Sequence, residues 1–182
     1  PLTPVSVYAL RKVTAYHACK LYRDTFKLKI YGAIFYNHES EIRPEEYVTR
    51  KITKSVARIF YGKQKILKLG DVNTKIDWGY AKDYVESSYK IMQLKKPDFF
   101  VIASGKKHSV LDFVKKSFKY VGLNYKQYLK IDKKLFRPSK TASLVGNINK
   151  AKKTFKYKPK TNLDQLISIM MENDLNNEKN NF

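Results

Sequence analysis

The sequence of 182 residues contains little of what several common functional classes require. Its single cysteine, Cys19, excludes an internal disulfide and a thiolate metal cluster, and its three histidines are scattered. None of its seven glycines forms a Gly-x-Gly-x-x-Gly or Gly-x-x-Gly-x-x-Gly loop, so it has no phosphate cradle for a dinucleotide. No apolar run approaches the roughly 20 residues of a membrane span, and no signal-peptide pattern opens the chain. We therefore expect no bound metal and a cytoplasmic location.

Acidic residues are scarce as well. The chain has 16 Asp and Glu against 37 Lys and Arg, which gives a formal net charge of +21 and a pI of about 9.9. Such a charge is typical of proteins that bind nucleic acid or another anionic surface. However, only six of the basic residues are arginines, the lysines are spread along nearly the whole chain, and no zinc-finger, basic-zipper or RNA-binding signature occurs. A basic nucleic-acid-binding protein therefore remains the weaker alternative.

What the chain does contain is an alternation of amphipathic helical segments and short apolar runs. The spacing predicts helices over 6–26, 44–62, 81–92, 109–121 and 161–175, and strands over 28–36, 66–69, 99–103 and 126–131. In the first helix, burial is expected for Ala9, Val13, Ala15, Tyr16, Cys19 and Tyr22. The Asn-rich end from residue 176 is expected to fray. Since helices and strands alternate without repeats or a linker, the pattern indicates an α/β fold.

A tyrosine and a lysine at the start of the first helix are the first candidate catalytic pair. Tyr8 and Lys12 are four residues apart, so they lie one above the other on a helix. A phenol has a pKa of about 10, and a neighbouring cation favours the phenolate, which can accept a proton from an alcohol. Because tyrosine and lysine are both abundant here, the spacing alone is more typical of a solvated helix face than of a catalytic pair.

A second candidate group follows the first predicted strand. Asn37, His38, Glu39 and Ser40 come directly after this apolar run. In α/β proteins, ligands bind outside the carboxyl ends of the strands. These polar residues are therefore expected at a ligand site, although His38 and Glu39 could equally serve as structural hydrogen-bonding groups.

Several motifs taken together resemble the C-terminal half of the GDP-mannose 4,6-dehydratases, a family of extended short-chain dehydrogenases/reductases. They cover nearly the whole chain in the family's order and spacing. The matching stretches are Pro4-x-Ser6-x-Tyr8-Ala9-x-x-Lys12, Tyr36-Asn37-His38-Glu39-Ser40, Val48-Thr49-Arg50-Lys51-Ile52, Asp77-Trp78-Gly79-x-Ala81-Lys82-Asp83-Tyr84 and Phe136-Arg137-Pro138. The resemblance implies the last strands and helices of a Rossmann-like sheet, interleaved with a small α/β substrate-binding domain.

The resemblance also implies an activity, a cofactor and a set of site residues. The family converts GDP-mannose into GDP-4-keto-6-deoxymannose with NADP, and the resemblance makes a homo-oligomer possible. Tyr8 would be the base toward the hexose 4-hydroxyl, and Lys12 would lower its pKa and hold the nicotinamide ribose. His38 and Arg43 match positions that contact NADP. The GDP-sugar would be held by the region that contains Asn37, Val48, Lys51 and Arg137.

The chain departs from the family pattern in two ways that bear on activity. The family usually has an arginine before Asp-Trp-Gly that contacts the substrate diphosphate, and this chain has Ile76 there. The chain also starts at a proline, close to the catalytic helix, so we expect a fragment that lacks the N-terminal, cofactor-binding half and is inactive alone. Another NAD(P)-dependent nucleotide-sugar dehydratase or epimerase is the alternative enzyme.

The resemblance divides the chain into three parts. Residues 1–40 would be the catalytic helix and the following strand of a truncated Rossmann-like domain. Residues 41–175 would form mainly the substrate-binding domain. Residues 176–182 are expected to be a disordered tail.

Overall fold

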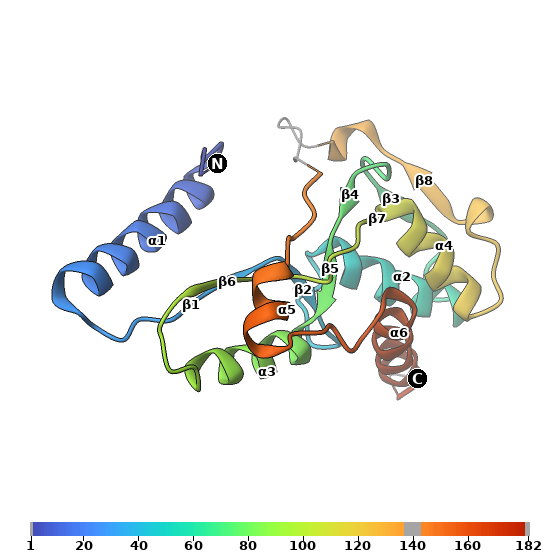
Figure 1. Cartoon of the computed structure of the whole chain (residues 1–182). Helices are drawn as coiled ribbons and strands as arrows, with labels where there is room; N and C mark the ends of the chain where they lie inside the picture. Colours follow the sequence, from blue (N-terminus) through green and yellow to red (C-terminus); the bar gives the residue numbers. More distant parts are fainter. Residues whose placement is uncertain (1, 137–142, 181–182) are drawn as a thin grey trace.

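The structure of the protein, a computed structural model, describes residues 2–136 and 143–180 and shows a mixed α/β chain (Figure 1). In chain order its elements are α1 Val7–Phe26, β1 Gly32–Phe35, β2 Asn37–Glu39, α2 Val48–Phe60, β3 Leu67–Leu69, β4 Lys75–Ile76, β5 Trp78–Tyr80, α3 Ala81–Met92, β6 Phe99–Ile102, β7 His108–Ser109, α4 Val110–Tyr120, the 3-10 turn η1 Tyr125–Gln127, β8 Leu129–Ile131, the 3-10 turn η2 Lys133–Leu135, α5 Asn149–Phe155 and α6 Leu163–Asn180.

The described strands pair two by two. β1 runs parallel to β6, β2 parallel to β5, and β3 parallel to β8, whereas β4 and β7 are antiparallel. Parallel partners need a crossover connection, and helices supply it here, as in other α/β proteins. The β1–β6 pair continues into the next residue, because the backbone amide of Tyr36 donates to Ile102 at 3.0 Å. The polar segment after β1 thus starts at a fixed point of the fold.

Two hydrophobic clusters hold these elements together. The larger one joins α2, α4 and α6 over β3 and contains Ile52, Val56, Phe113, Phe118 and Met170. The smaller one joins α3, β6 and α5 and contains Tyr84, Phe100, Ile102, Ile148 and Tyr157. All the residues in both lists are at most 6 % exposed. Since full burial of one large apolar side chain is worth about 1.5–3 kcal/mol, these clusters supply most of the driving force for folding.

The helices of the larger cluster follow their sequence patterns closely. Leu163, Leu166, Ile167, Met170 and Met171 of α6 are all buried, as their helical spacing predicts. At the start of α4, Asp112 N donates to Ser109 Oγ at 3.0 Å, and Ser109 N donates to Asp112 Oδ2 at 2.9 Å. This reciprocal capping box satisfies two amides that a helix start leaves without partners.

Three expectations about local structure were wrong. α2 begins at Val48 and not at Pro44, because residues 44–47 form a turn in which Tyr47 N donates to Pro44 O at 3.2 Å. The strand expected from residue 28 begins at Gly32, and the polar residues Asn37–Glu39 are themselves a short strand. Residues 176–180, expected in a disordered tail, continue α6, where the buried Glu178 pairs with Arg58 and Lys63.

α1 stands apart from the rest of the molecule (Figure 1). Its length agrees with the sequence, and Ser6 caps it by accepting from Ala9 N at 3.1 Å. The expected burial was wrong, because no residue of α1 is buried. Ala9, Val13, Tyr16 and Cys19 are half-buried, and the ring of Tyr16 lies 4.8 Å from that of Phe99 on β6. Ala15 and Tyr22, which were also expected to be buried, are exposed, and so are Val7, Leu10, Leu21 and Phe26.

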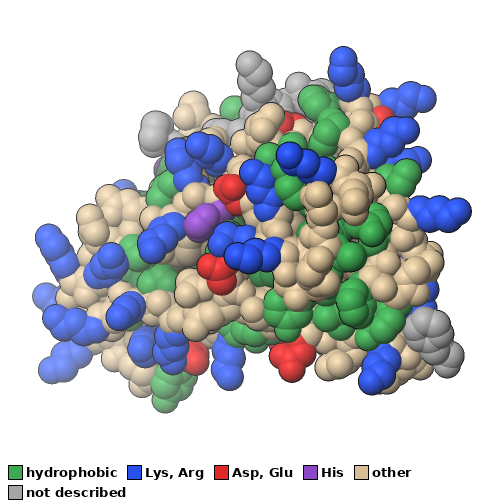
Figure 2. All heavy atoms as spheres, turned by 90° about the vertical axis from the view of Figure 1, so that its right-hand side faces the viewer, with side chains coloured by type: hydrophobic (Ala, Val, Ile, Leu, Met, Phe, Trp, Pro, Cys, Tyr) green, Lys and Arg blue, Asp and Glu red, His purple; other side chains and the backbone are tan. Residues whose placement is uncertain are grey.

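Among the described residues, the basic side chains do not form one patch on the face in Figure 2, and the helices do not have the character of membrane spans. Lys and Arg side chains are scattered over the face in Figure 2 and are not gathered into one stripe. Within residues 2–136 and 143–180, no helix is both long and apolar enough to cross a membrane.

Candidate active site

Tyr8 and Lys12 lie on the first turns of α1, on one face as their spacing predicts. The Lys12 ammonium is 5.5 Å from the centre of the Tyr8 ring. Tyr8 is 68 % exposed, so its hydroxyl is open to solvent. The two side chains therefore lie beside each other on a helix that the rest of the chain covers little.

The polar segment after β1 forms β2, which pairs with β5 so that His38 faces Gly79. His38 Nδ1 lies 2.9 Å from the carbonyl oxygen of Tyr36. Its ring packs against Phe35 and Tyr84, with centroids 5.5 and 5.3 Å away. These contacts fix the imidazole at the carboxyl end of β1, while Asn37 beside it is exposed.

Glu39 ends β2 as a buried carboxylate. Its Oε2 accepts a hydrogen bond from the Thr49 hydroxyl at 2.6 Å and lies 3.3 Å from Arg43 Nε. Burial raises the pKa of Glu39 above the usual range, while Thr49, Arg43 and His38 oppose this. Glu39 therefore joins β2, α2 and the loop between them.

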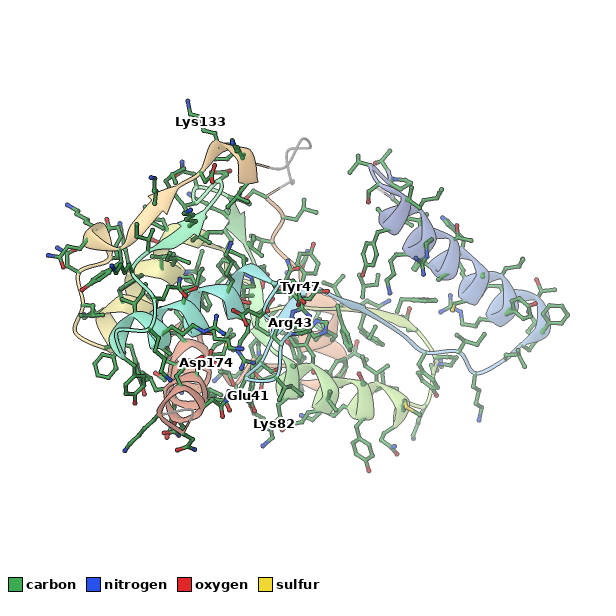
Figure 3. The ribbon with its side chains drawn as sticks, turned by 180° about the vertical axis from the view of Figure 1, so that it is seen from behind. Glu41, Arg43, Tyr47, Lys82, Lys133 and Asp174 are labelled. Atoms are coloured by element: carbon green, nitrogen blue, oxygen red, sulfur yellow. The ribbon has the colours of Figure 1, made fainter. Side chains whose placement is uncertain are left out.

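Arg43 lies on this loop, which spans residues 40–47. Its guanidinium carbon is 3.5 Å from the centre of the Tyr47 ring, a close cation–π contact. Figure 3 shows the two labelled side chains next to each other in the body of the molecule, well away from α1. The loop backbone is held in turn by α2, because Arg50 Nη1 donates to the carbonyl oxygens of Glu41 and Arg43, the latter at 3.2 Å.

The positions expected to hold the GDP-sugar are only partly gathered. Val48 packs against the larger hydrophobic cluster, and Lys51 lies one helical turn from Tyr47, whose carbonyl oxygen accepts from Lys51 N at 2.8 Å. Asn37 lies on the neighbouring strand β2. Arg137 falls outside the described residues.

Ile76, which stands where the family usually has an arginine, belongs to the hydrophobic interior. It lies on β4 opposite His108 and packs against the larger cluster. This position therefore contributes to the core and not to an anion site.

The next residue, Asp77, has a larger part in the fold than its sequence position suggests. It is 1 % exposed, and its two carboxylate oxygens accept hydrogen bonds from the backbone amides of Ser104, Gly105 and Gly146 and from the Ser104 hydroxyl, at 2.6–3.1 Å. The sequence suggests that Asp77 fixes one turn. In the structure it joins two segments that are 28 and 69 residues farther along the chain.

The structure brings Asn37, His38, Glu39 and Arg43 together and leaves Tyr8 and Lys12 apart from them. Within the described ranges, no hydrogen bond, ion pair or ring contact joins the two groups. Two residues near this group had not been predicted as site residues: Tyr47, whose ring packs on Arg43, and Asp174, which pairs with Arg50. Tyr47 could have been found from its spacing, four residues after Arg43, whereas Asp174 is too far along the chain for any local signal.

Comparison with known proteins decides the family. The family model for GDP-mannose 4,6 dehydratase matches residues 1–170. The chain belongs to the GDP-mannose 4,6-dehydratase family. GDP-mannose 4,6 dehydratase 1 of Arabidopsis thaliana is 42 % identical over 96 % of this chain, and the enzyme of Dictyostelium discoideum is 41 % identical over 99 % of it. The chain spans about half the length of these curated relatives, 48 % and 55 % respectively.

Solved structures confirm the fold of the extended short-chain dehydrogenases/reductases. RMD from Pseudomonas aeruginosa, complexed with NADPH, superposes with a TM-score of 0.88 at 16 % identity, over 96 % of this chain and 58 % of that one. The dTDP-glucose 4,6-dehydratase of Bacillus anthracis, in complex with NAD, gives 0.84 at 20 % identity, over 98 % and 55 %. Both of these neighbours hold a nicotinamide dinucleotide. The fold class expected from the sequence is thereby confirmed for this part of the family's structure.

Proposed function

We propose that this chain supplies the catalytic tyrosine and the sugar-nucleotide side of a 4,6-dehydratase that acts on GDP-mannose with NADP. The observation that carries the proposal is the family match over residues 1–170, within which Tyr8 and Lys12 stand one turn apart on α1. In this division, residues 1–40 belong to the cofactor-binding domain and residues 41–175 mainly to the substrate-binding domain. A cytoplasmic location fits a nucleotide-sugar substrate.

Tyr8 is the proton acceptor in this proposal. Its phenolate takes the proton of the hexose 4-hydroxyl, and Lys12 favours the phenolate by its charge. NADP would be held by Lys12, His38 and Arg43, and it would supply the hydride-transfer chemistry by which the 4-hydroxyl sugar becomes a 4-keto-6-deoxy sugar with loss of water across C5 and C6. No residue of this chain is assigned to remove the C5 proton.

The residues near β2 suit phosphate-bearing ligands. Arg43 is partly exposed, and the terminal nitrogens of its guanidinium make no hydrogen bond to any described residue. A free guanidinium fork matches phosphate geometry, so Arg43 and His38 are assigned to NADP. Asn37, Val48, Lys51 and Arg137 are assigned to the GDP-sugar, since amide and cationic groups suit sugar hydroxyls and a diphosphate.

The remaining groups must come from a dinucleotide-binding half of the family's enzyme, which is the proposed partner. Two features of the surface support a partner at this place. Among the described residues β1 pairs with β6 alone, so the other edge of β1 carries unpaired backbone groups. In addition, α1 exposes Val7, Leu10, Leu21 and Phe26, an apolar surface that a further α/β layer would cover.

Turnover with and without the partner half tests the proposal. The chain is incubated with GDP-mannose and NADP, either alone or with the dinucleotide-binding half of the Arabidopsis relative, and the 4-keto sugar is measured. We expect product only with both parts, and Tyr8→Phe lowers the rate by about 10²–10⁴-fold, the usual share of a general base. Tyr22→Phe, another exposed tyrosine of α1, is the control.

The same assay decides the substrate class and the division of labour. UDP-glucose and dTDP-glucose replace GDP-mannose in parallel reactions. Preferred turnover of either one would contradict the GDP-mannose assignment. Product from the chain alone would show that the partner half is not needed.

A further inference from the structure

The loop of residues 40–47 is held from three directions although it is not a regular element. At its start, Arg43 N donates to Ser40 O at 3.1 Å, and at its end Tyr47 N donates to Pro44 O at 3.2 Å. From the side, Asn173 Nδ2 of α6 donates to Glu41 O at 3.2 Å. These bonds fix the backbone that carries Arg43.

A buried ion pair anchors the same loop from the core. Arg50 of α2 donates to both carboxylate oxygens of Asp174 at 3.0 and 3.1 Å, and its Nη1 reaches the carbonyl oxygens of Glu41 and Arg43. Asp174 is 1 % exposed and also accepts from the Thr53 hydroxyl at 2.7 Å. Because desolvation offsets much of the attraction in a buried pair, its main consequence is the geometry that it imposes.

The side chain of Arg43 is also fixed in position, by contacts on two sides. On one side Glu39 Oε2 lies 3.3 Å from Nε, without the alignment of a hydrogen bond. On the other side the Tyr47 ring lies 3.5 Å below the guanidinium carbon. The two terminal nitrogens have no partner among the described residues, and 23 % of the side chain is exposed. A flat, always charged fork that is fixed at one end and free at the other is suited to a bidentate phosphate contact.

We propose that Glu39 and Tyr47 are positioning residues that hold Arg43 in advance as a receptor for a phosphate group. This inference rests on the proposed function, in which Arg43 belongs to the NADP side of the site. Neither positioning residue touches the ligand. Glu39 places the guanidinium by charge from the buried end of β2, and Tyr47 fixes the plane of the fork.

Binding of inorganic pyrophosphate to the whole chain tests the receptor without any need for turnover. The chain has six arginines, so the side-chain Nε–H signals of a ¹⁵N-labelled sample are few, and the loss of one signal in Arg43→Ala assigns it. Titration with pyrophosphate should shift the Arg43 signal. The dissociation constant obtained from this signal should be lower than that of non-specific pyrophosphate binding at the scattered lysines. Glu39→Gln and Tyr47→Leu should each raise this constant about 2- to 12-fold, the cost of immobilising one long side chain on binding.

A matched carboxylate on the same loop is the control. Glu45 pairs with Lys54 and Arg58 and, among the described residues, makes no hydrogen bond or ion pair with Arg43, so Glu45→Gln should leave the Arg43 titration unchanged. Tyr47 is 48 % exposed, so Tyr47→Leu serves as the test if Glu39→Gln fails to fold. Equal pyrophosphate affinity in the wild type, Tyr47→Leu and Glu45→Gln would overturn the proposal, as would an Arg43→Ala variant that binds as well as the wild type.

Titrations with NADP and with GDP-mannose separate the two sources of phosphate. A loss of NADP affinity but not of GDP-mannose affinity in Arg43→Ala supports the cofactor phosphate, and the reverse overturns that assignment. The result does not depend on dehydratase activity. A chain that never forms product can still confirm the receptor, and a failed receptor leaves Tyr8 and Lys12 as the proposed catalytic pair.

Discussion

Replacing Tyr84 by phenylalanine compares a buried hydroxyl that has no partner with a similar one that has a partner. Tyr84 on α3 is 1 % exposed, and its hydroxyl makes no hydrogen bond to any described residue. Tyr157 is 4 % exposed, and its hydroxyl donates to Ala103 O at 2.9 Å. Both rings belong to the smaller hydrophobic cluster, so the two variants remove one oxygen each from the same surroundings.

At neutral pH the two substitutions should have opposite effects. An unpaired buried hydroxyl costs about 1–3 kcal/mol, so Tyr84→Phe should be neutral or raise the free energy of unfolding by about 1 kcal/mol. Tyr157→Phe removes a hydrogen bond and leaves the Ala103 carbonyl oxygen without its donor. It should lower the free energy of unfolding by about 1–3 kcal/mol.

Between neutral and alkaline pH, the difference in free energy of unfolding between each variant and the wild type should shift in favour of the variant. Burial raises the pKa of Tyr84 and of Tyr157, and neighbouring groups, Asp77 and Asp83 among them, raise both further. Above a pH of about 10 the unfolded tyrosines lose their protons while the folded ones keep them, so stability falls as pH rises. The slope is about 1.4 kcal/mol per pH unit for each tyrosine. Each variant lacks one titrating tyrosine, so at pH 11 it escapes about 1.4 kcal/mol of the destabilisation that the wild type undergoes.

Urea unfolding of the wild type and both variants at pH 8 and pH 11, followed by circular dichroism, measures all of these differences. The lysines and the other tyrosines titrate in every sample and cancel in the comparison. An equal loss in both variants at pH 8 would mean that the Tyr84 hydroxyl has a partner. Differences that do not change between pH 8 and pH 11 would refute the raised pKa values.

Two further substitutions test how the segment around residue 146 is held by Ala103 and by Asp77. A Cβ on Gly146 would lie 2.2 Å from the Cβ of Ala103. Gly146→Ala should therefore lower the free energy of unfolding by about 2–3 kcal/mol in thermal unfolding, and the additional substitution Ala103→Gly should restore part of the loss. Asp77→Asn replaces one carboxylate oxygen by a donor that faces other donors, so it should lower the free energy of unfolding by about 2–5 kcal/mol. The control Asp71→Asn, in an exposed turn, should lower it by less than about 1 kcal/mol in the same assay.

Sequence patterns predicted the elements whose information is local. The positions that α6 buries follow from helical spacing, and the start of α4 follows from Ser109 and Asp112. The failures have physical causes that lie outside the segment concerned. The end of α6 is ordered because Glu178 meets Arg58, a residue 120 positions earlier, and no local signal carries that contact.

The candidate site divides in the same way. Tyr8 with Lys12, and His38 beside Asn37, are predictable because each group is contiguous or one helical turn apart in the sequence. Only some of the contacts that position Arg43 can be predicted from the sequence. Glu39 and Tyr47 stand four residues to either side of it, whereas Asp174 acts on the loop through Arg50, which lies 124 residues before it in the chain. The α1 residues that were predicted to be buried, from Ala9 to Tyr22, are half-buried or exposed, because the pattern alone cannot say what covers a helix.

The two groups of the proposed site therefore depend on different parts of the molecule. The loop with Arg43 is fixed by contacts inside this chain, so a substitution in α6 that breaks the Asp174–Arg50 pair should act on phosphate binding even without a partner. Tyr8 and Lys12 stand on a helix that touches the body mainly where Tyr16 and Arg23 meet Phe99, at 4.8 and 4.9 Å. Their position relative to Arg43 is set by whatever covers the apolar face of α1 and the free edge of β1. A partner that binds there would thus act on catalysis by bringing the tyrosine and the anion receptor to a fixed separation.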